Sequence, residues 1–197
     1  MTDIDAKTVA ELRKQTGVGM MECKNALRES EGDIENAIDL LRKRGAQMAA
    51  KRADRATTQG WVGSYIHANG KIGVIVEVLC ETDFVAKNDQ FQTLIKDIAM
   101  HIAAMNPAAL NSEGLDPQLV AKEREVYIEQ VKDKPENIRG NIVEGKLQKF
   151  YSEVCLMNQA FIKDDKKSIE QLIVDAIATI GENIQVTRFH RIQIGEE

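Results

Sequence analysis

The chain has 197 residues and a net charge of −5, with 43% hydrophobic, 29% charged and 5% aromatic residues. This length allows one domain and a second small one, and the hydrophobic content is typical of a folded chain rather than a disordered one. The acidic balance argues against direct nucleic-acid binding, because contacts to phosphate groups need clustered positive charge. Three widely spaced cysteines indicate free thiols, so we expect a cytoplasmic protein. No apolar run reaches about 18 residues, so we expect no membrane partner.

Residues 1–45 are predicted to form a small domain of three helices. Asp5 and Asp33 are suitable caps for the first and third helices, and Gly17 and Gly45 are the expected helix ends. Apolar residues recur at helical spacing, and the side chains expected to point inward are Val9, Leu12, Met20, Met21, Cys23, Ala26, Leu27, Ile34, Ala37, Ile38 and Leu41. A core this small suits a recognition module better than an enzyme.

Residues 46–59 are expected to form a basic helical linker. The stretch from Arg42 to Arg55 carries six Lys or Arg and one Asp, and its alanines favour a helix. Two interpretations stay open at this point. The segment is either a solvated connector or a cationic strip that faces an acidic surface on a partner.

Residues 60–197 are predicted to form an α+β core in which helices pack a small antiparallel sheet. Two strands, 61–67 and 72–80, are joined by a segment with an Asn-Gly pair, which predicts a hairpin with a type I′ turn. The alternate side chains of the second strand, Ile72, Val74, Val76, Val78 and Cys80, are expected to form its buried face. A stretch from about 184 to 194 adds a third strand.

Four further helices are expected in this core. The first begins at Asn88 or Asp89 and ends at Met105, before a proline, with Phe91, Ile95, Ile98, Ile102 and Met105 on its inner face. Helices at 117–132 and 135–154 are predicted to form a helical hairpin, the second with Ile138, Ile142, Phe150 and Val154 inward. After a solvated turn at Asp164 and Asp165, Ser168 begins the last helix.

The sequence offers no convincing catalytic, metal or cofactor site. Residues 140–146 match a phosphate-binding loop, but Leu147 stands where the motif needs a hydroxyl, and the context is helical. None of the three histidines lies at metal-ligand spacing from a cysteine or carboxylate. We therefore expect no catalytic residue and a protein that acts by binding. Two rivals remain: an enzyme that uses His101 with Asp83, and a scaffold that binds a peptide or ubiquitin-like partner through residues 5–45.

The segment Thr82–Val85 places an aromatic residue between the end of a strand and the start of a helix. From the residues alone, the simpler interpretation is that Phe84 folds back and packs on the following helix. The functional alternative is a rigid loop tip that presents Asp83 and Phe84 to a pocket on a partner, since aromatic side chains at such positions are typical binding hot spots.

Two long stretches, Leu12–Leu27 and Val78–Asn88, resemble the signatures of the bacterial elongation factor Ts family. Shorter stretches at 100–103, 144–147 and 180–184 fit the same family, in the same order along the chain. The resemblance covers essentially the whole sequence. It corresponds to a short form that contains a single half of the family's core.

The resemblance implies a guanine-nucleotide exchange factor for elongation factor Tu, with a ubiquitin-associated-like three-helix domain before the α+β core. It implies that the chain binds the GDP form and inserts a loop beside the partner's Mg²⁺ and phosphate site. Mg²⁺ is then displaced and GDP released. The residues assigned to this loop are Thr82, Asp83, Phe84 and Val85, and other positions expected near the contact surface are Met20, Lys24, Lys51, His101, Ile180 and Gly181.

A homodimer is also expected, since longer family members carry two similar core halves and this chain carries one. A sheet of three strands has two exposed edges, and its second face is partly apolar through Ile75 and Leu79. A two-fold contact that includes the strand at Gln185–Ile194 would cover it and give a dimer that binds two partner molecules. The alternative is a monomer in which the helical hairpin, residues 116–154, covers the sheet.

Overall fold

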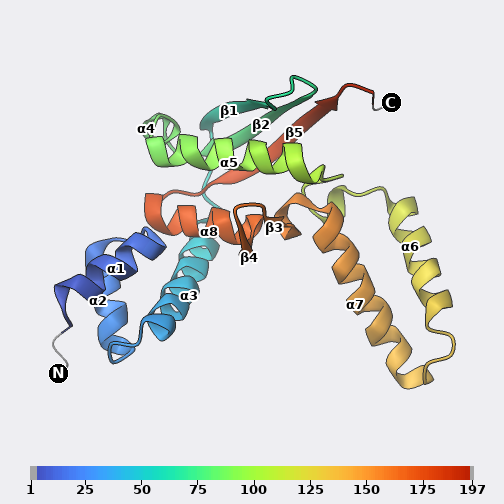
Figure 1. The fold of residues 1–197 in the computed structure, drawn as a ribbon, viewed down its shortest axis with the longest axis horizontal. Helices are drawn as coiled ribbons and strands as arrows, with labels where there is room; N and C mark the ends of the chain where they lie inside the picture. Colours follow the sequence, from blue (N-terminus) through green and yellow to red (C-terminus); the bar gives the residue numbers. More distant parts are fainter. Residues whose placement is uncertain (1–3, 196–197) are drawn as a thin grey trace. The chain divides into compact units, whose positions relative to one another are not determined.

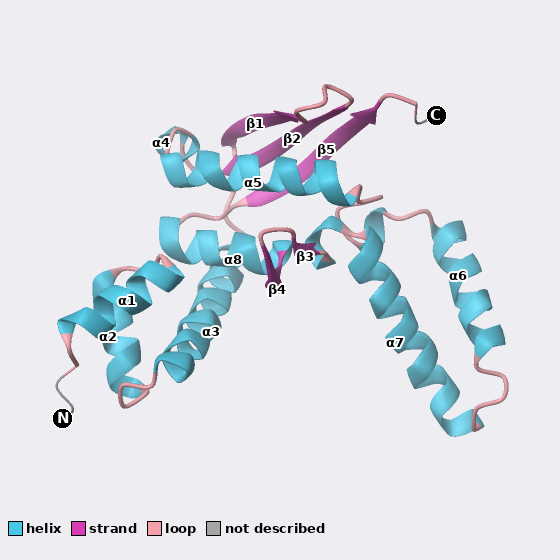
Figure 2. Cartoon of the chain, viewed as in Figure 1, coloured by secondary structure: helices cyan, strands magenta, loops and turns pink. Residues whose placement is uncertain are grey.

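A computed structural model describes residues 4–195, and its helices and strands are shown in Figures 1 and 2. Its elements are α1 (Ala6–Thr16), α2 (Met20–Glu29), α3 (Ile34–Arg52), β1 (Gln59–Ile66), β2 (Ile72–Cys80), α4 (Asp83–Ala86), α5 (Asp89–Met105), α6 (Pro117–Gln130), α7 (Glu136–Val154), β3 (Ala160–Phe161), β4 (Asp164–Ser168), α8 (Ile169–Ile180) and β5 (Gln185–Gln193), with short 3₁₀ turns at Ser112–Gly114 and Leu156–Asn158. This mixture of helices and a small sheet confirms the α+β class. Within residues 4–195, no helix is both long enough and apolar enough to span a membrane.

The described chain divides into two compact units. The first contains the residues up to Val62 together with Glu77–Ile95 and Gln171–Gln185. The second contains Gly63–Val76, Lys96–Glu170 and the residues from Val186 on.

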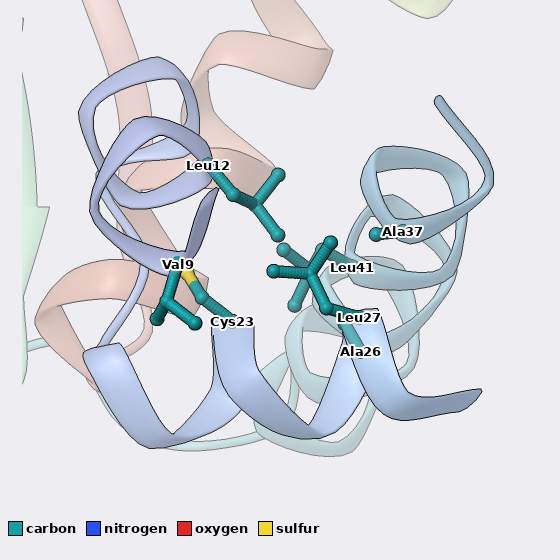
Figure 3. Close-up of a cluster of buried hydrophobic side chains, with 7 residues drawn as sticks. All are labelled: Val9, Leu12, Cys23, Ala26, Leu27, Ala37 and Leu41. Atoms are coloured by element: carbon teal, nitrogen blue, oxygen red, sulfur yellow. The ribbon is translucent and has the colours of Figure 1, made fainter. Parts of the chain in front are cut away.

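Helices α1, α2 and α3 begin the first unit and enclose one small core. Asp5 and Asp33 cap α1 and α3, since their carboxylates accept hydrogen bonds from the backbone N–H groups of Lys7 (3.3 Å) and Asn36 (2.9 Å). The buried side chains are Val9, Leu12, Cys23, Ala26, Leu27, Ala37 and Leu41 (Figure 3). The three-helix prediction is confirmed. The inward placement of Met20 and Met21 is wrong, because both side chains are exposed.

The sequence predicted that the third helix ends at Gly45. In the structure α3 continues to Arg52. Gly45 is buried within the helix, and a Cβ atom built there would lie 3.4 Å from the side chain of Ala178 on α8. This distance is ordinary van der Waals contact, so α8 lies beside α3 at this position. The alanines that follow favour the helix, which continues through the glycine.

The sheet has the order β1-β2-β5, with β1 and β2 joined as a hairpin. The carbonyl of His67 accepts a hydrogen bond from Gly70, and the N–H of His67 donates to the carbonyl of Ile72. Gly70 has a φ of +68°, but Asn69 is not among the residues with positive φ. The type I′ turn, which needs two such residues, is therefore wrong, and the hairpin closes through a four-residue loop.

The expected buried face of β2 is largely confirmed. Val74, Val76, Val78 and Cys80 are buried, and Ile72 at the strand's beginning is half-buried. Helix α5 follows with its bounds as predicted, capped by Asn88, whose side-chain oxygen accepts the N–H of Gln90 at 2.7 Å. Its inner residues are buried except Met105, which is exposed and was placed inward wrongly.

The second unit contains the predicted helical hairpin of α6 and α7. Its buried side chains on α7 are Val143 and Leu147, whereas Ile138 is exposed, so the predicted inner face of α7 was wrong at that position. Residues 140–146 lie inside α7. Lys146 donates to Gln130 at 2.7 Å, and its ammonium lies 5.5 Å from the ring centre of Tyr127.

A second, two-stranded hairpin of β3 and β4 was not predicted. The strands pair antiparallel where the sequence suggested only a solvated turn at Asp164 and Asp165. The only large apolar residue within these short strands is Phe161, which is buried, so the apolar alternation that predicts a strand is absent.

Candidate functional site

The sequence predicted that the segment Thr82–Val85 is a loop. In the structure it instead forms the beginning of a one-turn helix, α4. Thr82 caps this turn, because its hydroxyl oxygen accepts the backbone N–H of Val85 at 3.3 Å. Asp83 stands in the first turn, where a negative charge suits the helix dipole. The local sequence therefore has the features of a helix N-terminus, but the helix ends after one turn.

Phe84 on this turn is 82% exposed, more than any other large hydrophobic side chain in residues 4–195. The prediction that it packs back on the following helix is therefore wrong. Full burial of a phenylalanine side chain is worth roughly 1.5–3 kcal/mol. This free energy is not used within the chain and is available to a partner that covers the ring.

Asp83 lies beside Phe84 and forms an ion pair with Lys87, one helical turn later, at 3.0 Å. Both side chains are at least half exposed. An ion pair this exposed contributes little to stability, and the carboxylate remains accessible to a partner.

The inner side of the α4 turn is packed and hydrogen-bonded. Ala86 is buried, and its carbonyl accepts a hydrogen bond from the side chain of Gln92 at 2.6 Å. The buried thiol of Cys80 donates to the carbonyl of Thr82 at 3.1 Å. Burial, followed by the nearby charge of Glu182, raises the pKa of the Cys80 thiol, so the sulfur stays protonated and able to donate.

The carboxylate of Glu182 accepts three hydrogen bonds at the start of α4. One oxygen takes the backbone N–H groups of Glu81 and Thr82, each at 3.0 Å, and the other takes the Thr82 hydroxyl at 2.6 Å. Sequence reasoning did not single out Glu182, although it lies in one of the stretches that resemble the family. The signal that could have identified it is its position, since a charged residue directly follows the glycine that ends a helix.

Glu81 and Asn183 connect the start of α4 to the end of α3. The Glu81 carboxylate accepts the N–H of Asn183 at 2.7 Å and pairs with Arg52 and Arg55 at 3.7 and 3.4 Å. The hydrogen bond from the backbone of Asn183, helped by Arg55 and Arg52, holds the pKa of Glu81 below its usual value. The side-chain amide of Asn183 donates to the carbonyls of Ala53 (3.2 Å) and Arg55 (2.9 Å). The basic segment is therefore not only a solvated connector.

His101, which the resemblance placed near the contact surface, is fully buried in the second unit. Its Nδ1 accepts the N–H of Ile162 at 3.4 Å, so the ring proton lies on Nε2, which donates to the side-chain oxygen of Gln159 at 3.0 Å. Both ring nitrogens are occupied, which leaves neither for Asp83. The predicted surface contact and the pairing of His101 with Asp83 are both wrong, and the residue is structural.

Burial lowers the pKa of His101 below its ordinary value. The unfolded chain then binds a proton more readily than the folded one, so the free energy of unfolding should fall as the pH decreases below about 6.5. His101→Gln should make this pH dependence shallower in urea unfolding between about pH 7 and pH 5. An equal slope in His101→Gln and the parent chain would contradict this assignment.

The remaining predicted contact residues lie in the first unit. Met20 and Lys51 are exposed, while Lys24, Ile180 and Gly181 are half-buried. Gly181 ends α8 with a φ of +88°, and its N–H donates to the carbonyl of Ile177 at 2.9 Å. Across the part of the chain that the structure describes, no three His, Cys, Asp or Glu side chains form a group that could hold a metal ion.

Comparison with known proteins agrees with the resemblance. The family described as "Elongation factor TS" matches residues 5–196. A protein named elongation factor Ts from Oleidesulfovibrio alaskensis is 56% identical over 197 residues, with 99% of this chain and all of that protein covered. Proteins of the same name from Nitratidesulfovibrio vulgaris and Thermosipho melanesiensis are each 54% identical, with 98% of this chain and 98% and 100% of their own length covered. The chain therefore belongs to the elongation factor Ts family, the nucleotide exchange factors of elongation factor Tu.

Proposed function

We propose that the α4 turn carries out the exchange of guanine nucleotide on elongation factor Tu. The chain binds the GDP form, and Asp83 and Phe84 enter beside the partner's Mg²⁺ and phosphate site. Mg²⁺ is displaced and GDP leaves. The observation that supports this role is the 82% exposure of Phe84 on a turn that is hydrogen-bonded on its inner side. A scaffold for a peptide or ubiquitin-like partner has no comparable feature in its favour.

Exchange of this kind needs no covalent chemistry. A protein that binds the nucleotide-free partner more tightly than the GDP-bound one weakens GDP binding by the same factor. To weaken GDP binding by about a thousandfold, the coupling free energy must be about 4 kcal/mol. Burial of the Phe84 ring supplies roughly 1.5–3 kcal/mol, and disturbance of an ion that neutralises phosphate charge supplies more.

The N-terminal helices and the end of α8 supply further contacts in this proposal. Met20 and Lys51 are exposed, and Lys24, Ile180 and Gly181 keep part of their surface accessible. These residues contribute affinity rather than exchange, and the N-terminal helices contact the GTPase domain of the partner. The likeness of the three-helix module to a ubiquitin-associated domain stays a prediction.

The linkage is tested by titrating the chain into elongation factor Tu and following the heat of binding. The nucleotide-free form should bind about a thousandfold more tightly than the form saturated with GDP and Mg²⁺. Equal affinities for the two forms would contradict the proposed function, because no free energy would then be available to weaken GDP binding.

We also propose a homodimer formed through the open face of the sheet in the second unit. Ile66, Ile75 and Ile192 are 66%, 53% and 70% exposed. A Cβ at Gly73 would lie 3.2 Å from Ile66, which places Ile66 on the same face as Ile75. Arg191, the neighbour of Ile192, bonds the carbonyl of Ala103 on α5, so Ile192 points to the opposite face. Because these side chains are exposed, the hairpin of α6 and α7 does not cover them.

Light scattering of the free protein tests the dimer. The chain mass is 22.0 kDa, so the expected particle has twice that mass. Ile75→Lys places a charge in the interface and should reduce the mass to that of one chain. Lys substitution of Ile128, which is exposed on α6, is the matched control and should leave the dimer intact. A parent chain that remains at 22.0 kDa at micromolar concentration would contradict the proposal.

A further inference from the structure

Glu182 lies on the segment after α8, about 100 positions from the turn that it holds. We propose that Glu182 is a positioning residue for nucleotide exchange, whose carboxylate fixes the α4 turn so that Phe84 meets the partner in one orientation. The inference rests on the proposed function, since it concerns how the same site is prepared for its partner.

The α4 turn cannot hold its own conformation, because it has only four residues. Isolated helices this short are unstable in water, and the N–H groups at their start lack partners within the helix. Glu182 supplies partners for the N–H groups of Glu81 and Thr82 and for the Thr82 hydroxyl. The negative carboxylate also suits the positive end of the turn.

The carboxylate is itself held in place from both sides. Gly181 turns the chain at the end of α8 with a φ of +88°, so that Glu182 follows directly. The next residue, Asn183, is 2% exposed and donates to the carboxylate of Glu81 and to the carbonyls of Ala53 and Arg55. Glu182 is thus attached to the end of α3, and the turn is attached to Glu182.

This arrangement explains how an exposed aromatic side chain can act efficiently. A group that is ordered before binding loses less conformational entropy when the partner closes around it. A small displacement of a positioned group can cost up to about a hundredfold in rate. Glu182 makes no contact with the partner in this proposal, so its effect on exchange passes through Phe84.

Glu182→Gln tests the inference with nearly unchanged shape. An amide has one accepting oxygen, so its NH₂ group would face either the two backbone N–H donors or the Thr82 hydroxyl. The maximal rate of GDP release at saturating protein should fall about tenfold, while the half-saturating concentration changes less than about twofold. Glu170→Gln, at an exposed position in the first turn of α8, is the matched control and should behave like the parent chain. An unchanged maximal rate in Glu182→Gln would overturn the inference.

A double-mutant cycle separates positioning from general destabilisation. If Glu182 acts through Phe84, Glu182→Gln should cost nothing further in a chain that already carries Phe84→Ala. A full tenfold loss in both backgrounds would overturn the inference. Should Glu182→Gln fail to fold, Thr82→Val removes the hydroxyl's hydrogen bond to Glu182 together with its cap on the N–H of Val85. Thr82→Ser, which keeps the hydroxyl, should lose less of the maximal rate. Equal losses would count against the inference.

Hydrogen–deuterium exchange of the free protein tests the positioning without the partner. In Glu182→Gln the amides of residues 82–88 should exchange faster, while those of α1 and α2 keep their protection. Unchanged protection of residues 82–88 would overturn the inference even if the parent chain exchanges nucleotide. A parent chain that does not accelerate GDP release would instead contradict the proposed function, and the hydrogen-exchange result would still decide whether Glu182 holds the turn.

Discussion

Phe84→Ala should slow the catalysed release of GDP from elongation factor Tu at least about tenfold, because it removes a hot-spot contact worth roughly 2 kcal/mol or more. The side chain is 82% exposed in the free chain, so its removal leaves no cavity. The melting temperature and the circular dichroism spectrum should therefore barely change. Stopped-flow release of a fluorescent GDP analogue measures the rate at saturating concentrations of each variant.

The control for this prediction is Met105→Ala, which truncates an exposed hydrophobic side chain at the end of α5. Its release rate should equal that of the parent chain, because only the α4 turn is assigned to the partner's nucleotide site. If Phe84→Ala releases GDP at the parent rate, or if it unfolds, Phe84 has a structural role and the assignment is wrong.

Gly60→Ala should produce the largest loss of stability among single substitutions of a glycine. Gly60 in β1 has a φ of +155°, and a Cβ there would lie 2.3 Å from the carbonyl oxygen of Val78 and 2.8 Å from the Cα of Leu79. Both atoms belong to the backbone of β2, which cannot move without breaking the sheet. We expect the free energy of unfolding to decrease by about 3 kcal/mol or more, measured by urea unfolding.

Gly145→Ala is the matched control, since the same substitution is made where nothing surrounds the new methyl group. Gly145 lies within α7, and no heavy atom outside its own helix turn is within 4 Å of its built Cβ. Alanine favours a helix over glycine by about 0.5–1 kcal/mol, so this variant should be slightly more stable than the parent. If Gly60→Ala and Gly145→Ala lose similar amounts of stability, the contact of the new methyl group with β2 is not the cause of the loss in Gly60→Ala.

Local signals in the sequence predicted most element boundaries correctly. Asp5, Asp33 and Asn88 cap helices as expected, because a side-chain oxygen at that position satisfies an N–H group that the helix leaves free. The prediction was wrong at Gly45, where α3 continues through a residue type that often ends helices. A glycine in a helical pattern does not reveal whether the helix ends there, since the alanines that follow it favour continuation.

The candidate site was predicted in part. The resemblance identified Thr82–Val85, but the residues alone favoured a packed Phe84, and only the structure shows the ring in solvent. Glu182 was missed because its contact with Thr82 joins segments far apart in sequence, which no periodicity reveals. His101 was misplaced because a histidine in a family signature gives no sign of its burial.

The most direct test of nucleotide exchange uses elongation factor Tu loaded with fluorescent GDP, an excess of unlabelled GDP, and this chain at about a tenth of the partner's concentration. Because an exchange factor dissociates from its partner after each exchange cycle, a small amount of it should release the labelled GDP from all of the partner molecules. The rate of release should be proportional to the concentration of the chain. Release at the intrinsic rate of the partner, or release that stops after one equivalent of chain is consumed, would contradict the account.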